Sequence, residues 1–301
     1  MAVKLGLLDF GRRTTTLSSM GKVLDVIDYA EKADEMGFSR YWISEHHNYS
    51  NMDAWSSPLM MVPILLQSTS KIKIGVGGVL LNYYSPYEIA LHFKLMENLF
   101  PGRLDLGIAN GTPPVQVGKF MLHRKRNKIP DMMAEKMKSL HQFFNHEEQM
   151  VEKYQVVIPP YKGQVPDTFM LGSSFRHTAT AIEYRMNYAR SMFHSTKPVE
   201  YERDTIARYK EDYYNVHGRL PQVIVAFSGV CRKTEEEAKH LAETASTGNF
   251  VNSFIGSLPQ FEDRINQYRE AFGVDEFMFF DLLLDNTARL ESLYYLQSII
   301  K

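Results

Sequence analysis

Three consecutive residues with acid–base side chains, Glu45, His46 and His47, follow an apolar segment at residues 41–44. If that segment continues as an extended strand, alternation puts His46 on the opposite face from Glu45 and His47. An imidazole on the face that looks into a site accepts or donates a proton near neutral pH. Two structural histidines in a turn would have the same spacing. A metal site is less favoured, because adjacent histidines do not easily bind one ion and no third ligand is patterned nearby.

A glycine pair, Gly77 and Gly78, follows the apolar segment at residues 72–76. Glycine weakens a strand, so it often marks a bulge or a place where something flat or bulky approaches the backbone. A simple tight turn has the same composition, and the pattern is weak when taken alone.

A polar turn with Ser173, Ser174, Arg176 and His177 follows the apolar segment at residues 169–171. A helix is expected to start there, and its first N–H groups, together with serine and arginine side chains, would form a cradle for an anion. Ordinary N-capping by serine would use the same residues. The adjacent arginine and histidine favour a phosphate site.

Aromatic and methionine side chains follow several of the strand ends. Most residues of these types should belong to the core. A few at the mouth of a site would form a dry, adaptable substrate pocket. The candidates are Phe10, Tyr83, Tyr84, Met192 and Phe193.

These candidates need a framework that brings strand ends together. Short apolar segments alternate with longer segments of helical periodicity, which predicts about eight strands, each followed by a helix. The predicted strands are residues 3–8, 41–44, 72–76, 103–108, 169–171, 188–191, 223–227 and 276–280. The predicted helices include residues 23–33 (ended by Gly37), one opening at 56–58 with a serine cap and a proline, and 86–100, 133–144 and 258–272.

The alternation predicts an α/β fold, a single (β/α)8 TIM barrel with loop insertions that spans residues 1–301. The main insertion is expected at residues 151–167, which are rich in proline and glycine and have no period. An open doubly wound sheet is the alternative, but residues 8–13 lack its glycine-rich phosphate turn. In a parallel barrel, functional groups collect at the C-terminal ends of the strands, where these candidates fall.

Composition excludes several classes of protein. The 34 basic and 35 acidic residues give a net charge of −1, which provides no electrostatic attraction to nucleic acid or to an anionic membrane. A single cysteine, Cys231, excludes an internal disulfide and fits a reducing compartment. The most apolar stretch, residues 58–66, is far shorter than the ~20 residues that span a bilayer. We expect a cytoplasmic protein without an export signal.

The chain also resembles the bacterial luciferase-like family of flavin-dependent monooxygenases over nearly its whole length. Single motifs are weak, but six in the same order are specific. They are residues 40–48 (RYWISEHHN), 75–81 (GVGGVLL), 100–107 (FPGRLDLG), 171–174 (LGSS), 234–238 (TEEEA) and 274–276 (VDE).

The resemblance implies a barrel that binds reduced FMN at its mouth, where O2 forms a flavin hydroperoxide that oxygenates a small organic substrate. It further implies a homodimer. Because no second nucleotide-binding pattern is present, the reduced flavin is expected from a separate flavin reductase.

In this resemblance, His46 matches the family's active-site histidine, which hydrogen-bonds the flavin–oxygen adduct or moves a proton. Gly77 and Gly78 match the segment of a non-proline cis peptide against the flavin ring, and Ser173 and Ser174 match the phosphate-binding turn. The remaining positions expected at the flavin are Glu45, Ala109, Asn110, Phe175, Arg176 and His177.

Three residues depart from the family pattern. Asn110 stands where an arginine near the flavin is frequent, which implies weaker flavin binding unless Arg176 or the basic residues 124–126 substitute. Met192 stands where relatives often have a polar residue, and Pro63 should kink or shift a helix. Two alternatives stay open: a hydride-transfer enzyme using a deazaflavin, whose relatives tend to have Asp-His after the second strand, and a flavin-binding protein without turnover.

Overall fold

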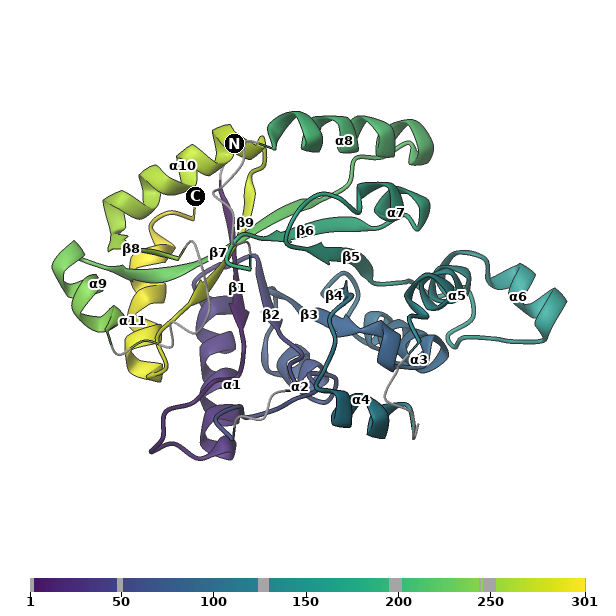
Figure 1. Cartoon of the computed structure of the whole chain (residues 1–301), viewed down its shortest axis with the longest axis horizontal. Coiled ribbons are helices and arrows are strands. Elements are labelled where there is room, and N and C mark those ends of the chain that lie inside the picture. Colours follow the sequence, from purple (N-terminus) through teal and green to yellow (C-terminus); the bar gives the residue numbers. More distant parts are fainter. Residues whose placement is uncertain are drawn as a thin grey trace.

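The computed structural model describes residues 3–47, 51–123, 130–194, 202–243, 245 and 253–300. Eight parallel strands form a closed barrel, in which β6 pairs with β7, and β9 lies between β7 and β1. This closure confirms the predicted (β/α)8 barrel and excludes the open sheet (Figure 1). The barrel strands are β1 (Lys4–Asp9), β2 (Arg40–Ile43), β3 (Lys73–Leu80), β4 (Leu104–Ala109), β5 (Asp167–Gly172), β6 (Asn187–Ser191), β7 (Val223–Arg232) and β9 (Glu276–Asp281).

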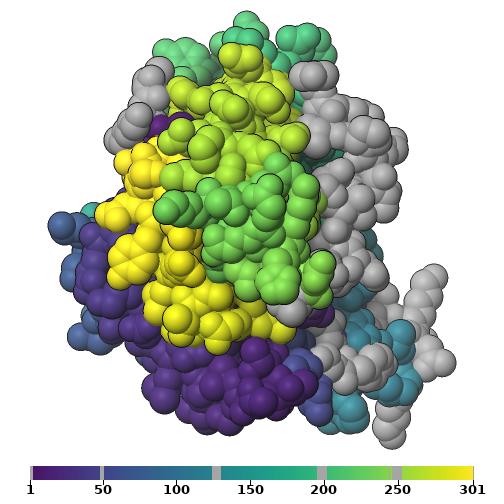
Figure 2. All heavy atoms as spheres, turned by 90° about the vertical axis from the view of Figure 1, so that its left-hand side faces the viewer, coloured from purple at the N-terminus to yellow at the C-terminus, as the bar shows by residue number. Residues whose placement is uncertain are grey.

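Helices surround the barrel and connect its strands (Figure 1). They are α1 (Ser19–Glu35), α2 (Met61–Ser68), α3 (Pro86–Leu99), α4 (Val115–Met121), α5 (Met133–Asn145), α6 (Glu147–Tyr154), α7 (Thr178–Glu183), α8 (Arg203–His217), α9 (Glu235–Ala242), α10 (Leu258–Phe272) and α11 (Asn286–Gln297), with a short 3-10 turn, η1 (Leu81–Tyr83). The predicted end of α1 is confirmed, since Gly37 has a φ of 85°. Figure 2 shows α9, α10, α11 and α1 covering one side of the barrel with a continuous surface.

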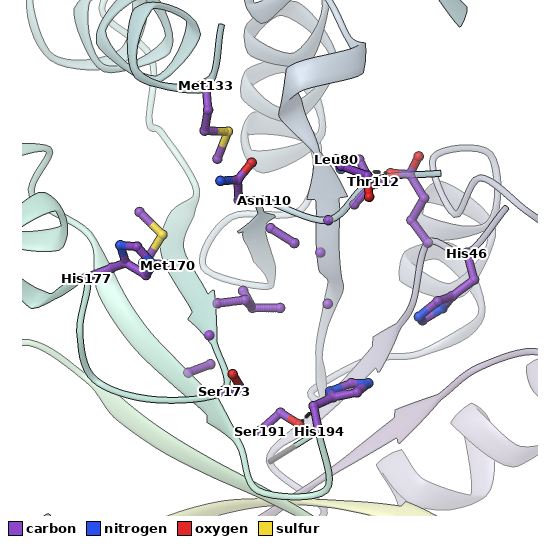
Figure 3. Close-up of a pocket in the computed structure, with 18 of the residues that line it drawn as sticks. His46, Leu80, Asn110, Thr112, Met133, Met170, Ser173, His177, Ser191 and His194 are labelled. Carbon is purple, nitrogen blue, oxygen red and sulfur yellow. Dashed lines mark hydrogen bonds between the residues drawn. The ribbon is translucent and has the colours of Figure 1, made fainter. Parts of the chain in front are cut away.

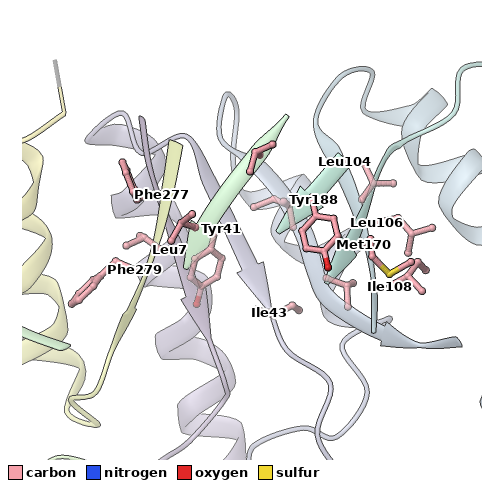
Figure 4. Packing of buried hydrophobic residues seen from close by; sticks show 14 of the residues in the cluster. Leu7, Tyr41, Ile43, Leu104, Leu106, Ile108, Met170, Tyr188, Phe277 and Phe279 are labelled. Carbon is pink, nitrogen blue, oxygen red and sulfur yellow. The ribbon is translucent and has the colours of Figure 1, made fainter. Parts of the chain in front are cut away.

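Side-chain alternation along the strands divides the core into two parts. Leu7 and Tyr41 point outward to a large cluster between the strands and the helices (Figure 4). Their neighbours Leu8 and Trp42 belong to a second cluster in the barrel interior. The same alternation therefore builds the hydrophobic layer under the helices and the floor of the barrel mouth.

The N-terminal end of the barrel is closed by charged side chains. Arg40, the first residue of β2, donates to Asp105 Oδ2 at 2.5 Å and to Glu276 Oε1 at 2.6 Å. Trp42 Nε1 donates to the same Asp105 oxygen at 2.9 Å. Lys73 lies 2.6 Å from Asp167, at the starts of β3 and β5. These ion pairs occupy the N-terminal end of the barrel, on the side away from the C-terminal ends of the strands.

Three local expectations differ from the structure. The helix predicted to open at residues 56–58 begins at Met61, because the Pro58 carbonyl accepts the Met61 N–H in a turn and no serine side chain caps the helix. Pro63 therefore lies in the first turn, where a missing N–H removes no intrahelical bond, so no kink is needed. A ninth strand, β8 (Phe254–Ser257), was not predicted and pairs with the part of β7 beyond the barrel.

The predicted insertion at residues 151–167 is partly helical. Its first residues complete α6, and residues 155–166 form the loop that leads to β5. Lys94 on α3 is fully buried, pairs with Glu147, and donates to the Ile158 carbonyl at 3.0 Å. This pair fastens the insertion to the barrel helices.

Candidate active site

A cavity of about 920 Å³ opens at the C-terminal ends of the strands (Figure 3). This volume lies in the upper part of the range for small-molecule and cofactor sites. The structure brings most of the sequence candidates to its wall. They are Phe10, Glu45, His46, Gly77, Gly78, Ala109, Asn110, Ser173, Arg176, His177 and Phe193.

Three of the expected substrate residues do not line this cavity. Tyr83 and Met192 are buried, and Met192 belongs to the core between the strands and helices. Tyr84 is half-buried and its hydroxyl donates to Glu45 Oε1 at 2.8 Å. The sequence placed them in the cavity wall because they follow strand ends, but Tyr83 and Met192 are buried outside it and Tyr84 lies behind Glu45.

Two residues of the serine turn also lie behind the wall. Phe175 is buried, with its ring centroid 5.1 Å from that of Tyr188. The backbone carbonyl of Ser174 accepts a hydrogen bond from the Tyr188 hydroxyl at 2.8 Å. This anchoring fixes the turn so that Ser173 and Arg176 face the cavity while Ser174 and Phe175 do not.

Glu45 joins the ends of β2 and β3. Its Oε1 accepts from His47 Nε2 at 2.8 Å and from the Tyr84 hydroxyl at 2.8 Å. Its Oε2 accepts from the Leu80 N–H at 3.1 Å. Although β2 ends at Ile43, His46 still pairs with Ser44 and His47 with Glu45, each two residues earlier, as alternation predicts. All three residues contribute to the cavity wall.

His46 has a defined orientation. Its Nδ1 is 2.9 Å from Ser44 Oγ, and its ring centroid is 4.7 Å from that of Phe10. Burial, followed by the charges of His194, Arg12 and His47, lowers the pKa of His46 to about 4. The imidazole is therefore neutral at neutral pH, with Nε2 as the nitrogen that it can offer to a bound molecule.

This lowered pKa predicts that acid destabilises the protein. Below pH 6.5 the unfolded chain takes up a proton on His46 that the folded state refuses until about pH 4. Stability should therefore fall as pH falls, by about 1.5 kcal/mol between pH 6.5 and pH 5 from this group. Urea unfolding at both pH values measures the change. The variant His46→Gln should lose less stability over this interval, and equal losses in both proteins would contradict the assignment.

Gly77 and Gly78 form part of the cavity wall, and the peptide bond between them is cis, as the resemblance implies. A Cβ on Gly78 would lie 2.7 Å from the Gly107 carbonyl oxygen on β4. A Cβ on Gly77 would lie 3.2 Å from the Trp42 ring and 3.3 Å from a Leu8 methyl group. The first contact is with backbone, whereas the second is with side chains that can adjust.

The two glycines should therefore respond differently to alanine. Gly78→Ala should destabilise the protein by about 1–3 kcal/mol, because β3 must move away from β4. Gly77→Ala should cost less, because side chains absorb the contact. Thermal unfolding of both variants makes the comparison, and equal losses would show that the β4 backbone is not the constraint.

The cavity also contains residues that sequence reasoning missed. His194 and Ser191 lie at the end of β6, and Met133 and Met137 enter from α5 (Figure 3). His194 comes three residues after the last residue of β6. The rule that strand ends carry function could have found it, since it directly follows the predicted Phe193. The two methionines repeat at helical spacing, which gave no signal beyond an ordinary core helix.

The cavity has the features that a flat ring with an anionic tail requires. One end carries Ser173, Arg176 and His177, with Arg176 Nε donating to His177 Nε2 at 2.9 Å. The glycine pair leaves its part of the wall without side chains, and aromatic and methionine side chains line other parts. Residues 124–126, the alternative cationic cluster, lie outside the described residues. Among residues that the structure describes, no group of three or more His, Cys, Asp or Glu is arranged to hold a metal ion.

The sequence profile of the family described as luciferase-like monooxygenase matches residues 3–276. The chain belongs to the luciferase-like monooxygenase family. As a member it is an enzyme, a flavin-dependent oxidoreductase. An uncharacterized protein YwcH of Bacillus subtilis is 28% identical over 241 residues, 79% of this chain and 71% of that protein. The N-acetyl-S-alkylcysteine monooxygenase of the same organism is 27% identical over 282 residues, 90% of this chain and 82% of that enzyme.

Solved structures of this family's fold superpose over almost the entire chain. Apo-MsnO8 gives a TM-score of 0.84 at 22% identity, covering 99% of this chain and 98% of that one. The oxygenating constituent of 3,6-diketocamphane monooxygenase from Pseudomonas putida, in complex with FMN, gives 0.76 at 19% identity, with coverages of 100% and 98%. An F420-dependent secondary alcohol dehydrogenase gives 0.70 at 12% identity, with coverages of 100% and 98%. These likenesses establish the barrel fold.

Within the described ranges, no helix is both long and apolar enough to cross a membrane.

Proposed function

We propose that this luciferase-like enzyme uses reduced FMN and O2 to oxygenate a small organic substrate. The observation that carries the proposal is the convergence of His46, the glycine pair and the Ser173 turn on one cavity. The FMN complex of the diketocamphane enzyme supports the choice of flavin. When bound, reduced FMN would supply the electrons that activate O2.

Each part of the cavity has a role in this proposal. Ser173, Arg176 and His177 would bind the phosphate, since charge-assisted donors from arginine and hydroxyl groups suit it. The side-chain-free surface at Gly77 and Gly78 would accept the flat ring system. His46, neutral and oriented by Ser44, would hold or move a proton at Nε2.

The apolar part of the cavity would bind the substrate. Phe10 and Phe193 lie next to one another, with ring centroids 6.1 Å apart, and Met133 and Met170 line the wall as well. Aromatic and thioether surfaces hold apolar groups and exclude water from the reacting atoms. The substrate class that fits is a small, largely apolar organic molecule.

The supply of reduced flavin, the assembly and the compartment complete the proposal. A separate flavin reductase is proposed because the sequence contains no second nucleotide-binding pattern. A homodimer is supported by exposed apolar side chains on neighbouring helices, Ile64 on α2 and Leu95 and Leu99 on α3. Light scattering measures the assembly directly. A cytoplasmic location is consistent with the single cysteine.

Anaerobic titration with reduced FMN, oxidised FMN and a reduced deazaflavin tests the cofactor. Reduced FMN should bind best, and oxygen added with a substrate panel should yield an oxygenated product. Arg176→Ala should weaken binding of reduced FMN about 10- to 100-fold, while the exposed Arg208→Ala on α8 should not. Binding of the deazaflavin alone would replace the proposal with hydride transfer. Tight binding of oxidised flavin without any product would replace it with a non-catalytic role.

A further inference from the structure

Two histidines reach the same part of the cavity from opposite sides of the barrel. His46 follows β2 and His194 follows β6, and four strand-to-strand steps separate these strands in either direction around the barrel. Both rings nevertheless contact Phe10, with centroid distances of 4.7 Å for His46 and 6.4 Å for His194. Figure 3 shows both rings directed into the cavity.

The two histidines share one local arrangement. The Nδ1 atom of His46 is 2.9 Å from Ser44 Oγ, and that of His194 is 2.7 Å from Ser191 Oγ. In each case the serine comes two or three residues before the histidine, at the end of the preceding strand. A hydroxyl can donate to or accept from an imidazole nitrogen, so each serine holds its ring in place for either neutral tautomer.

We propose that His194 is a second proton-handling residue of this site, coupled to His46 so that the two imidazoles together take up a single proton. This inference rests on the proposed function and deepens it. Two imidazolium charges in one cavity repel each other, so protonation of one ring opposes protonation of the other. When one ring takes a proton from a bound molecule, the other ring therefore stays neutral.

The surroundings of the pair favour this behaviour. Burial is the main cause that lowers the pKa of His46, and the charge of His194 is the strongest neighbouring influence, ahead of Arg12 and His47. Burial also lowers the pKa of His194. The cavity wall also carries the carboxyl groups of Glu45 and Asp131 and the guanidinium groups of Arg176 and Arg190, and Glu45 is bonded to His47, Tyr84 and the Leu80 N–H.

Histidine titration by NMR in the flavin-free protein tests the coupling. In His194→Gln, the pKa of His46 should rise by about one unit. In His46→Gln, the pKa of His194 should rise by the same amount, because linkage between two binding equilibria is reciprocal. His92→Gln, an exposed change on α3, should move neither value. Circular dichroism checks that each variant is folded. Unmoved values in folded variants, or a shift in one direction only, would overturn the proposal.

The unmodified protein provides a test that does not depend on any variant folding. A coupled pair titrates in two broadened steps, whereas independent rings give simple curves, and simple curves for both rings would equally refute the coupling. Because this titration uses no flavin, a failure of flavin binding would refute the proposed function without affecting the test of the coupling.

In the active enzyme, His194→Gln should shift the acidic limb of the kcat–pH profile toward higher pH, because His46 gains a proton more easily. An unshifted limb would restrict His194 to a structural role.

Discussion

Replacing His46 with glutamine is expected to lower kcat for substrate oxygenation about 100-fold or more, while the Kd for reduced FMN changes little. Glutamine keeps a polar group of similar reach but cannot take up or release a proton. His46 is suited to that task, because Ser44 fixes its Nδ1 and burial keeps the ring neutral at neutral pH. Single-turnover product formation from pre-bound reduced FMN measures the chemical step separately from flavin supply.

The control for this variant is His92→Gln, an exposed position on α3 outside the cavity. It should leave both kcat and flavin affinity at the values of the unmodified enzyme. If His46→Gln turned over within about threefold of that enzyme, proton handling by His46 would be excluded. A loss of flavin binding without a loss of turnover per bound flavin would instead make His46 a binding residue.

Removing Asp9 is expected to have the largest effect on stability. Asp9 ends β1, is 3% exposed, and its Oδ2 lies 2.5 Å from Arg289 on α11. The same oxygen accepts from Tyr41 at 2.9 Å, and Oδ1 accepts from the Gly11 N–H at 2.7 Å. Asp9→Ala should cost about 3–5 kcal/mol, because it leaves the Arg289 charge buried without its partner. Chemical denaturation at pH 7 measures the loss.

Burial by itself would raise the pKa of Asp9, but Arg289 and Lys22 hold it well below its usual value. A lowered carboxylate pKa stabilises the folded state above the unfolded pKa of 3.8, so the contribution is fully present at pH 7 and is lost only in strong acid. Glu148→Ala, in an exposed ion pair with Lys162, should change stability little. A similarly small effect of Asp9→Ala would show that this pair is not what holds β1 against α11.

Asp9 also links stability to the site. Its bond to the Gly11 N–H fixes the turn that carries Phe10, and Phe10 contacts both His46 and His194. A folded Asp9→Ala protein should therefore lose order in this wall of the cavity, which the NMR signals of the two histidines would report.

Periodicity and composition were sufficient to predict the barrel. Strands such as β1 and β9 are short, continuous apolar segments, and helices such as α10 repeat apolar residues every three or four positions. These patterns are local, and the parallel α/β order then allows few topologies. The placement of His46, the glycine pair and the Ser173 turn followed from the rule that strand ends meet at one face of a parallel barrel.

Only the tertiary structure decided which of the strand-end residues face the cavity. Tyr83 and Met192 follow strands as Phe10 and Phe193 do, yet they turn into the core, because loop conformation rather than residue type sets the direction of a side chain after a strand has ended. The approach of His194 to His46 joins positions 148 residues apart on opposite sides of the barrel. No local pattern records this arrangement, since it exists only once the barrel has closed and has brought both rings to Phe10.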